Sequence, residues 1–205
     1  MSAHRPPLRL VVSAPTALEK PLAERGDDDL MLLARAGRQE AFAVLVERYL
    51  PRLVSFCGKF ISHARLGEEL AQEVLLQTWA RRHHYQPQGH FVPFLFTLAN
   101  NLCRNHVRDA TRRRRRESDE PAPERAAPEP AQLDVLLERE RTRRVHEAIG
   151  ALPENLREAV LLRFDQGLDY ADISRTLGCR EVTARSRVFH GIKRLRANLH
   201  AEDET

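Results

Sequence analysis

The sequence predicts an all-α protein: two small helical domains joined by a flexible linker rich in proline and glutamate. Three observations lead to this fold class. Apolar residues recur at helical spacings of three and four through most of the chain, and no convincing strand pattern appears. Between the two helical regions, residues 117–131 contain four prolines, five acids and no large apolar residue. Such a segment has nothing to bury and is expected to be an extended tether.

Composition excludes several classes of protein. The 205 residues, 42% of them hydrophobic and 30% charged, suffice for two small cores. No apolar run is long enough to span a membrane or to act as a signal peptide, so we expect a cytoplasmic protein without membrane insertion. The three cysteines lack the close spacing of zinc or disulfide frameworks, and no glycine-rich phosphate loop occurs. We therefore expect no metal, no cofactor and no enzymatic activity.

The linker at 117–131 sets the domain boundaries. It separates a first domain, 26–116, from a second domain, 132–200. Residues 1–25 contain four prolines without clear periodicity and are expected to be a mobile arm, and residues 201–205 form an acidic tail.

Short apolar faces and one proline predict the first three helices. The acidic run Asp27–Asp29 suits a helix N-terminus, and an apolar face follows it at Leu30, Leu33 and Ala34. A second helix carries the apolar face Phe42, Leu45, Val46, Tyr49 and Leu50. It is expected to stop near Pro51, because proline lacks an N–H and crowds the preceding turn. A third helix is then expected over about 53–62.

Two longer helices follow in the first domain. One, from about 67 to 82, places Leu70, Val74, Leu75 and Trp79 on one face and its acidic residues largely elsewhere. Residues 83–92 include Pro87 and Gly89 and predict a loop. After it, residues 94 to about 112 predict a helix that ends in basic residues.

The second domain contains a helix-turn-helix pattern over residues 168–196. Asp169 can cap a first helix with Tyr170, Ile173 and Leu177 turned inward, and Gly178 permits a tight turn. The next helix can turn Val182, Val188, Ile192 and Leu195 inward and five basic residues outward. Arginines, with Thr183 and Ser186 near the helix start, suit contact with the major groove of DNA. Helix pairs of this length also occur in proteins that do not bind DNA.

Five stretches resemble the sigma-70 superfamily of bacterial RNA polymerase initiation factors, in particular its short extracytoplasmic-function (ECF) group. Residues 27–57 are similar to the family's opening helices, and 67–82 to its acidic region 2.2. Residues 91–113 resemble the helix that handles the −10 promoter element, with Leu95, Ala99, Asn101 and Arg108 at matching positions. The stretches 152–174 and 183–187 resemble region 4. Some departures from the family pattern concern promoter preference rather than the class of protein. They lie at Phe94, Asn100, Asn105, Arg180 and Ala184.

The resemblance implies binding to bacterial core RNA polymerase, through the β′ clamp helices and the β flap, to promoter DNA, and to an anti-sigma factor. The acidic helix would dock on the basic clamp helices, since complementary charges steer association and fix register. The residues assigned to this contact are Glu68, Glu69, Leu70, Gln72 and Glu73. A solvated helix face is the alternative for these carboxylates.

Promoter opening also requires groups that capture unpaired bases by stacking and by hydrogen bonds to their edges. The loop after the acidic helix, together with the basic helix that follows, offers such groups. The residues assigned to the −10 element are His84, Tyr85, His90, Phe91, Asn100, Asn101, Arg104 and Arg108. The alternative for the aromatic residues Tyr85, Phe91 and Phe94 is that they close the domain core. A metal site at the histidines is disfavoured because no matching cysteine or carboxylate accompanies them.

The second helix of the helix-turn-helix is expected to read a duplex −35 element. The residues assigned to this contact are Arg180, Thr183, Arg185, Ser186, Arg187, His190, Lys193 and Arg194. The competing interpretation of the whole chain is a stand-alone helix-turn-helix regulator with a helical sensor domain. Such a regulator would bind its operator without polymerase.

Overall fold

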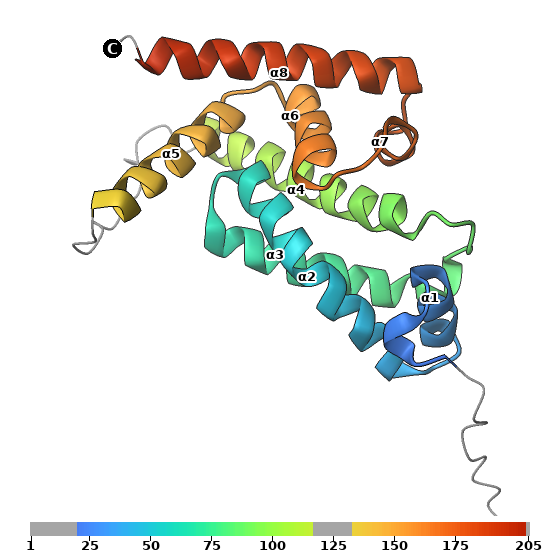
Figure 1. The fold of residues 1–205 in the computed structure, drawn as a ribbon. Helices are drawn as coiled ribbons and strands as arrows, with labels where there is room; N and C mark the ends of the chain where they lie inside the picture. Colours follow the sequence, from blue (N-terminus) through green and yellow to red (C-terminus); the bar gives the residue numbers. More distant parts are fainter. Residues whose placement is uncertain (1–19, 117–132, 204–205) are drawn as a thin grey trace, which may run out of the picture.

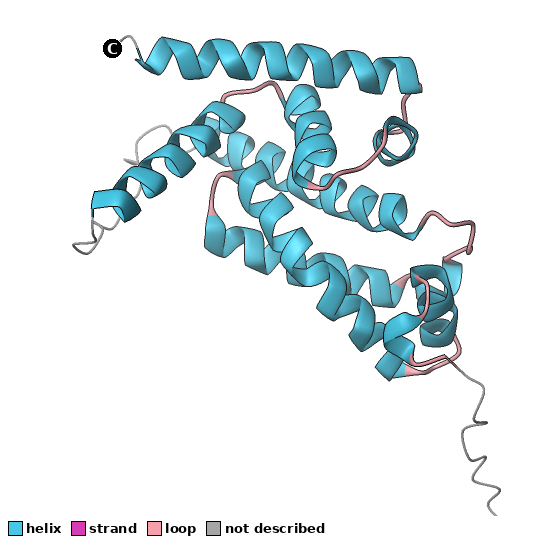
Figure 2. Ribbon diagram, in the orientation of Figure 1, coloured by secondary structure: helices cyan, strands magenta, loops and turns pink. Residues whose placement is uncertain are grey.

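The computed structural model describes residues 20–116 and 133–203, and all regular structure in those ranges is helical (Figures 1 and 2). The first domain contains α1 (Asp27–Arg35), α2 (Gln39–Ile61), α3 (Ala64–Ala80) and α4 (Phe91–Arg116). The second contains α5 (Leu133–Gly150), α6 (Glu154–Val160), α7 (Tyr170–Leu177) and α8 (Glu181–Asp203). Short turns connect them: the 3₁₀ turns η1 (Leu22–Glu24) and η2 (Arg82–His84), and the π-helical turn η3 (Leu161–Asp165). The predicted all-α class is confirmed.

The domain limits differ slightly from those expected. The predicted linker, most of the predicted arm and the last two residues of the predicted tail lie outside the described residues. Part of the arm nevertheless packs on the first domain, because Arg48 of α2 donates hydrogen bonds to the carbonyl oxygens of Ala23 and Arg25. At the other end, α8 continues to Asp203, into the predicted tail.

The prediction that a helix ends near Pro51 is wrong. A single helix, α2, runs from Gln39 to Ile61 with Pro51 inside it. A proline in a helix interior costs about 3 kcal/mol, mainly through the lost hydrogen bond and steric crowding. The ring of Pro51 is exposed, while Leu45, Tyr49, Leu53 and Phe56 on the same helix are buried. Burial of this continuous apolar stripe on both sides of the proline outweighs its cost, since each such side chain contributes about 1.5–3 kcal/mol.

A close helix crossing joins α2 to α3. Ser62 adopts a left-handed conformation at the end of α2, and the His63 side chain accepts the Leu66 N–H at the start of α3 (3.2 Å). A Cβ placed on Gly67 would lie only 2.5 Å from the Cα of Gly58. The two backbones can approach this closely only because position 67 is glycine, whereas a Cβ on Gly58 would find ordinary contact, 3.9 Å from the Cα of Ala64.

The core of the first domain is built around aromatic residues of α2 and α4. Phe56, Phe60 and Phe96 are fully buried, and the rings of Phe56 and Phe96 meet edge to face with centroids 5.4 Å apart. In Figure 1, α4 lies between the α2–α3 pair and the second domain. Helix α4 therefore has one side in its own core and another against the neighbouring domain.

The helix-turn-helix of the second domain forms as predicted, with two corrections in α8, at Val182 and at Arg187. Asp169 caps α7 by accepting the Asp172 N–H (2.7 Å), and Gly178 ends it in a left-handed conformation. The buried stripe of α8 begins later than expected, at Ala184, and continues through Val188 and Gly191. Val182 is 78% exposed rather than buried, because it lies two residues before that stripe, almost on the opposite side of the helix.

Candidate functional site

The acidic face of α3 is exposed and has an exposed apolar residue at its C-terminal end. Glu68, Glu69, Gln72 and Glu73 all face solvent, whereas Leu70 is buried and supports the helix from below. The exposed Leu76, which the sequence analysis did not single out, is 64% accessible. At 100° per residue it lies among Glu69, Gln72 and Glu73. Its spacing of three, four and seven residues from them was the available signal.

The predicted aromatic and histidine residues in and beside the loop after α3 fall into two groups, which differ in exposure. His84 is exposed and His90 is half-buried. Tyr85 and Phe91 lie in the core, where Tyr85 packs edge to face on Phe91 (centroids 5.9 Å apart) and against Phe94 (5.1 Å). Tyr85 and Phe91 therefore close the core of the first domain. Neighbouring rings cover the faces with which they would have to stack on a base.

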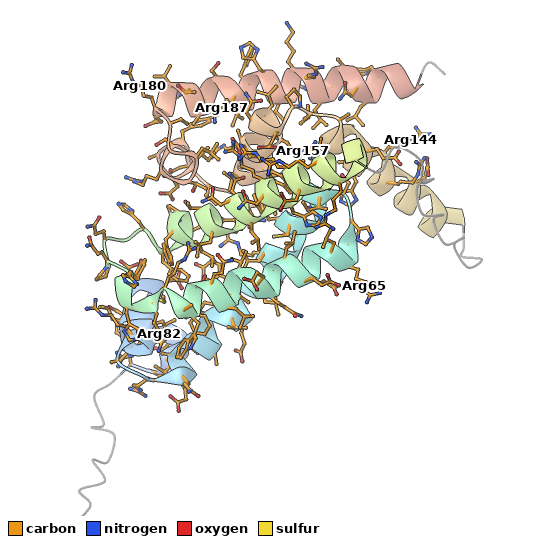
Figure 3. The ribbon with its side chains drawn as sticks, turned by 180° about the vertical axis from the view of Figure 1, so that it is seen from behind. Arg65, Arg82, Arg144, Arg157, Arg180 and Arg187 are labelled. Carbon is orange, nitrogen blue, oxygen red and sulfur yellow. The ribbon has the colours of Figure 1, made fainter. Side chains whose placement is uncertain are left out.

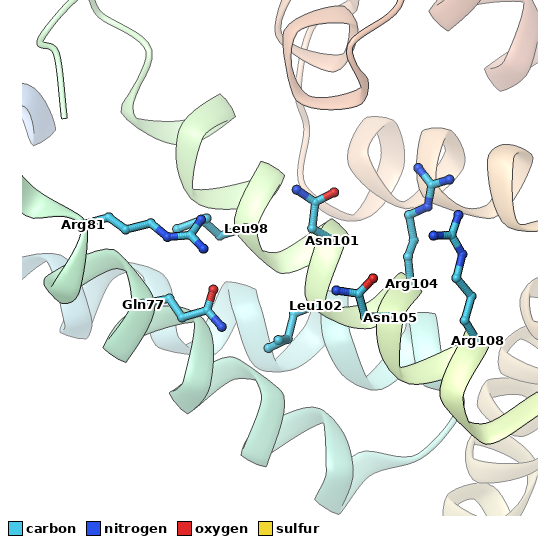
Figure 4. Close-up of a pocket in the computed structure, with 8 residues that line it drawn as sticks. All are labelled: Gln77, Arg81, Leu98, Asn101, Leu102, Arg104, Asn105 and Arg108. Carbon is cyan, nitrogen blue, oxygen red and sulfur yellow. The ribbon is translucent and has the colours of Figure 1, made fainter. Parts of the chain in front are cut away.

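A polar pocket of about 510 Å³ lies between α3 and α4. Asn101, Arg104 and Arg108, all predicted as −10 contacts, line it. Figure 4 shows Gln77 and Arg81 on the opposite wall, and Arg104 and Arg108 extending from α4 toward the second domain. The remaining lining residues are Leu98, Leu102 and Asn105. Its three arginines are accompanied by no acidic lining residue in the described part of the chain, so the pocket is electropositive.

The sequence analysis did not assign five of the eight residues that line this pocket: Gln77, Arg81, Leu98, Leu102 and Asn105. Leu98, Asn101, Leu102, Asn105 and Arg108 recur on one face of α4, at spacings of three and four. That periodicity was visible in the sequence. Gln77 and Arg81 come from the end of α3 and the residue after it, and only the packing of α3 on α4 brings them to the same pocket.

Asn100, also predicted as a −10 contact, does not face this pocket. It is 2% exposed and donates a hydrogen bond to the carboxylate of Glu158, in the second domain (3.0 Å). Arg104 is drawn toward the same domain, with an ion pair to Glu154 (2.7 Å) and a longer one to Glu158 (3.7 Å). In this arrangement Asn100 is inaccessible to DNA, and Arg104 is shared between the pocket and the domain interface.

Glu158 is a buried carboxylate, 1% exposed, that connects three elements. Besides Asn100 and Arg104 of α4, it accepts a hydrogen bond from Arg187 of α8 (3.3 Å). A buried charge persists only where partners of this kind compensate its desolvation. Arg187, predicted to contact the −35 element, therefore belongs to the inner side of α8.

The other basic residues of α8 are on its outer side. Arg180, Arg185, Ser186, His190, Lys193 and Arg194 are exposed, and Thr183 is half-buried. Arg185 lies over the ring of Tyr170, 4.7 Å from its centroid, and pairs with Glu181 (3.2 Å). Figure 3 shows Arg180 projecting from the start of α8, and Arg187 on the side that faces the rest of the molecule.

A second set of contacts joins the two domains through α2. Asp165 accepts hydrogen bonds from Ser55 (3.0 Å) and from Lys59. Arg52 donates to the side chain and to the backbone of Gln166 (3.2 and 2.8 Å). These contacts and the Glu158 cluster hold the described domains against one another.

Two other properties of the described residues bear on function. No three histidine, cysteine or acidic side chains among them lie close enough together to hold a metal ion. Within the same ranges, none of the helices has the length and apolar character needed to cross a membrane.

Comparison with protein-family models finds two matches, one in each domain. Residues 45–113 match sigma-70 region 2, and residues 142–195 match sigma-70 region 4. The chain is 31% identical over 168 residues to RNA polymerase sigma factor CarQ of Myxococcus xanthus, covering 80% of this chain and 92% of that protein. It is 29% identical over 180 residues to RNA polymerase sigma-H factor of Pseudomonas aeruginosa, with 82% and 91% covered.

Solved structures give the same result. CnrH, in complex with the cytosolic domain of CnrY, superimposes with a TM-score of 0.66 over 85% of this chain and 97% of that one, at 21% identity, which shows the shared fold. The sigma factor RpoE of Bartonella quintana, in complex with the anti-sigma factor NepR, superimposes with a TM-score of 0.63 at 28% identity, over 78% and 96% of the two chains.

Fold and surfaces together define a two-domain helical transcription protein with a helix-turn-helix. The family matches in both domains and the relatives that span most of the chain make the assignment narrower: this protein belongs to the sigma-70 family and is an RNA polymerase sigma factor of the ECF type. The competing interpretation was a stand-alone regulator with a sensor domain. It is set aside because the first domain of this protein matches sigma-70 region 2.

Proposed function

We propose that this sigma factor docks on core RNA polymerase through α3, reads the −10 element with the α3–α4 pocket and its adjoining loop, and reads the −35 element with the outer side of α8. It would act in the cytoplasm as a binding protein without catalytic activity of its own. The observation that carries the proposal is the electropositive 510 Å³ pocket, because it combines cations with amide groups beside the acidic helix.

The polymerase contact is proposed to centre on Leu76. Apolar residues surrounded by polar ones supply most of the energy of a protein interface, whereas rim charges mainly steer association. Glu69, Gln72 and Glu73 lie one to two turns before Leu76 on the same exposed face of α3. Such a surface suits the basic helices of a polymerase clamp.

The pocket suits a nucleotide that has left the base stack. Arginine binds phosphate through its planar fork, and an asparagine amide can bond to both an acceptor and a donor on a base edge. Arg81 and Arg108 would hold phosphates, while Asn101 and Asn105 would meet the base. Asn105 thus joins the predicted −10 residues, whereas Asn100 is held against Glu158 as long as the two domains stay closed.

The closed packing of the domains bears directly on this mechanism. In the closed form Arg104 points its Nε at Glu154, so part of its charge is compensated at the domain interface rather than available to a phosphate in the pocket. We infer that promoter binding separates α4 from the second domain. A partner that stabilises the closed form would inhibit the factor, and an anti-sigma factor, as bound by RpoE of Bartonella quintana, is the partner that we propose.

The proposal is tested by transcription in vitro. Core RNA polymerase with this protein is given a promoter library with randomised −35 and −10 positions, and the transcripts are sequenced. Asn101→Ala should change the preference at the −10 positions only, and Arg185→Ala the preference at −35 only. Loss of one base contact costs about 1–3 kcal/mol of discrimination. Arg35→Ala, on the exposed surface of α1, is the control. Duplex binding without polymerase, and no transcripts with it, would contradict the proposal.

A further inference from the structure

The three aspartates that begin α1 have different surroundings. The carboxylate of Asp27 accepts hydrogen bonds from Tyr49 and Arg48, both in α2. Asp28 instead accepts hydrogen bonds from the Tyr85 hydroxyl and the Gly89 N–H, both in the loop between α3 and α4 (each 2.5 Å). Asp29 is exposed and has no bonding partner among the described residues. Of the three aspartates, only Asp28 therefore has a described hydrogen bond to the loop.

The two bonds of Asp28 are placed on either side of the loop's tip. Tyr85 and Gly89 bracket the exposed residues Gln86, Pro87 and Gln88. Gly89 has φ +72°, a conformation that other residues adopt only with strain, and its N–H consequently points at Asp28. One carboxylate thus fixes both ends of a short exposed turn.

The inner anchor is rigid. Tyr85 is 4% exposed, and its ring is packed among the aromatic rings of Phe91 and Phe94. Burial, together with the hydrogen bond to Asp28, raises the pKa of the Tyr85 hydroxyl above its ordinary value, so the hydroxyl stays protonated and remains a donor. Hydrogen bonds to an ionised acceptor are roughly twice as strong as neutral ones.

We propose that Asp28 is a positioning residue for promoter recognition, which holds the loop between α3 and α4 in the shape that meets unpaired −10 bases. The proposal rests on the proposed function, which assigns this loop and the adjoining pocket to the −10 element. Asp28 touches no DNA in this scheme. It acts through the loop, because a recognition surface that is fixed before binding loses less conformational entropy and discriminates better than a mobile one.

The test compares four variants in the randomised promoter library, transcribed by core polymerase. Asp28→Ala removes both bonds to the loop. Asp28→Asn removes the charge but can keep both contacts, since its oxygen can accept the Gly89 N–H and its amide can donate to the Tyr85 oxygen. Asp29→Ala makes the same charge change one residue away, with no contact to the loop. Tyr85→Phe removes one bond and keeps the ring. Binding to core polymerase is measured in parallel by fluorescence anisotropy.

Asp28→Ala should reduce discrimination at one or more −10 positions by about tenfold, which corresponds to one well-made base contact. Tyr85→Phe should show part of this loss, while Asp28→Asn and Asp29→Ala should keep the wild-type preference. Affinity for core polymerase should be unchanged in all four. If Asp28→Ala proves unfolded by circular dichroism, Tyr85→Phe alone decides, because it deletes a single oxygen.

Two results would overturn the proposal. Equal −10 discrimination in Asp28→Ala, Tyr85→Phe and Asp29→Ala would show that the loop keeps its shape without these bonds. An equal loss of −10 discrimination in Asp28→Asn and Asp29→Ala would show that negative charge near the DNA matters, and not the position of the loop. Failure of the proposed function gives a different pattern, because the wild-type protein would then support transcription without any −10 preference.

Discussion

Replacing Asp165 by alanine should open the contact between the two domains without unfolding either of them. Asp165 lies at the end of η3, and its side chain is 11% exposed. Its partners across the interface, Ser55 and Lys59, are both in α2. No other acidic residue of the second domain pairs with α2 among the described residues, so the variant removes two interdomain hydrogen bonds to a carboxylate together, one of them from a charged donor and one from a hydroxyl.

The expected magnitude follows from these two bonds. A hydrogen bond to a charged group contributes about 1.5–3 kcal/mol, and both bonds are to the Asp165 carboxylate. Because Lys59 is 31% exposed and both donors regain water when Asp165 is removed, we discount the sum for solvent screening to about 2 kcal/mol in total. That corresponds to a roughly thirtyfold shift of the closed–open equilibrium toward the open form.

The assay is single-molecule energy transfer between dyes on Arg65→Cys in α3 and Arg196→Cys in α8, both exposed positions, with Cys179 replaced by serine. Asp165→Ala should increase the low-transfer population, and Lys59→Ala should produce much of the same shift. The double variant should then add little, as expected for a coupled pair. Asp172→Ala is the matched control, because Asp172 pairs only with Arg175 inside α7. An Asp165→Ala population indistinguishable from that of Asp172→Ala would refute the reasoning.

Three further predictions concern the first domain. Pro51→Ala should raise the free energy of unfolding by up to about 3 kcal/mol in urea titrations, because it restores a hydrogen bond in α2; an unchanged midpoint would mean that the helix already absorbs the proline without cost. Gly67→Ala should lower the free energy of unfolding by about 2–3 kcal/mol, because its Cβ would lie 2.5 Å from the Gly58 backbone; wild-type stability would contradict this close approach. Tyr85→Phe should make the protein less sensitive to alkali. The pKa of Tyr85 is raised in the folded state, so its stabilising contribution is complete below pH ~10, the ordinary tyrosine value, and is lost progressively above it. Urea midpoints at pH 9 and pH 11 measure this loss, and an equal drop in both proteins would count against it.

The sequence predicted the helical class, the two domains and the helix-turn-helix because these depend on local information. Periodicity, the aspartate cap at Asp169 and the glycine at Gly178 each act within a few residues. The misplaced helix end at Pro51 shows the limit of such reasoning. A proline's local cost was visible in the sequence, but the burial that outweighs it comes from helices elsewhere in the chain.

Residue types alone also predicted only part of the candidate binding surfaces. It identified the acidic face of α3 and the outer arginines of α8, which are exposed as expected. It could not tell Asn100 from Asn101, adjacent amides on one helix. Their side chains point about 100° apart, and only the neighbouring domain decides that one bonds to Glu158 while the other lines a pocket.

The sequence by itself thus determined the helical class, the presence of two domains and the family that the chain resembles. The tertiary structure decided which polar residues are free to bind. Asn100 and Arg187 are enclosed around Glu158, and Asp28 holds a loop that is more than fifty residues away along the chain. The physical reason is that helix formation depends on neighbours in sequence, whereas desolvation and hydrogen bonding of a side chain depend on whatever the fold places beside it.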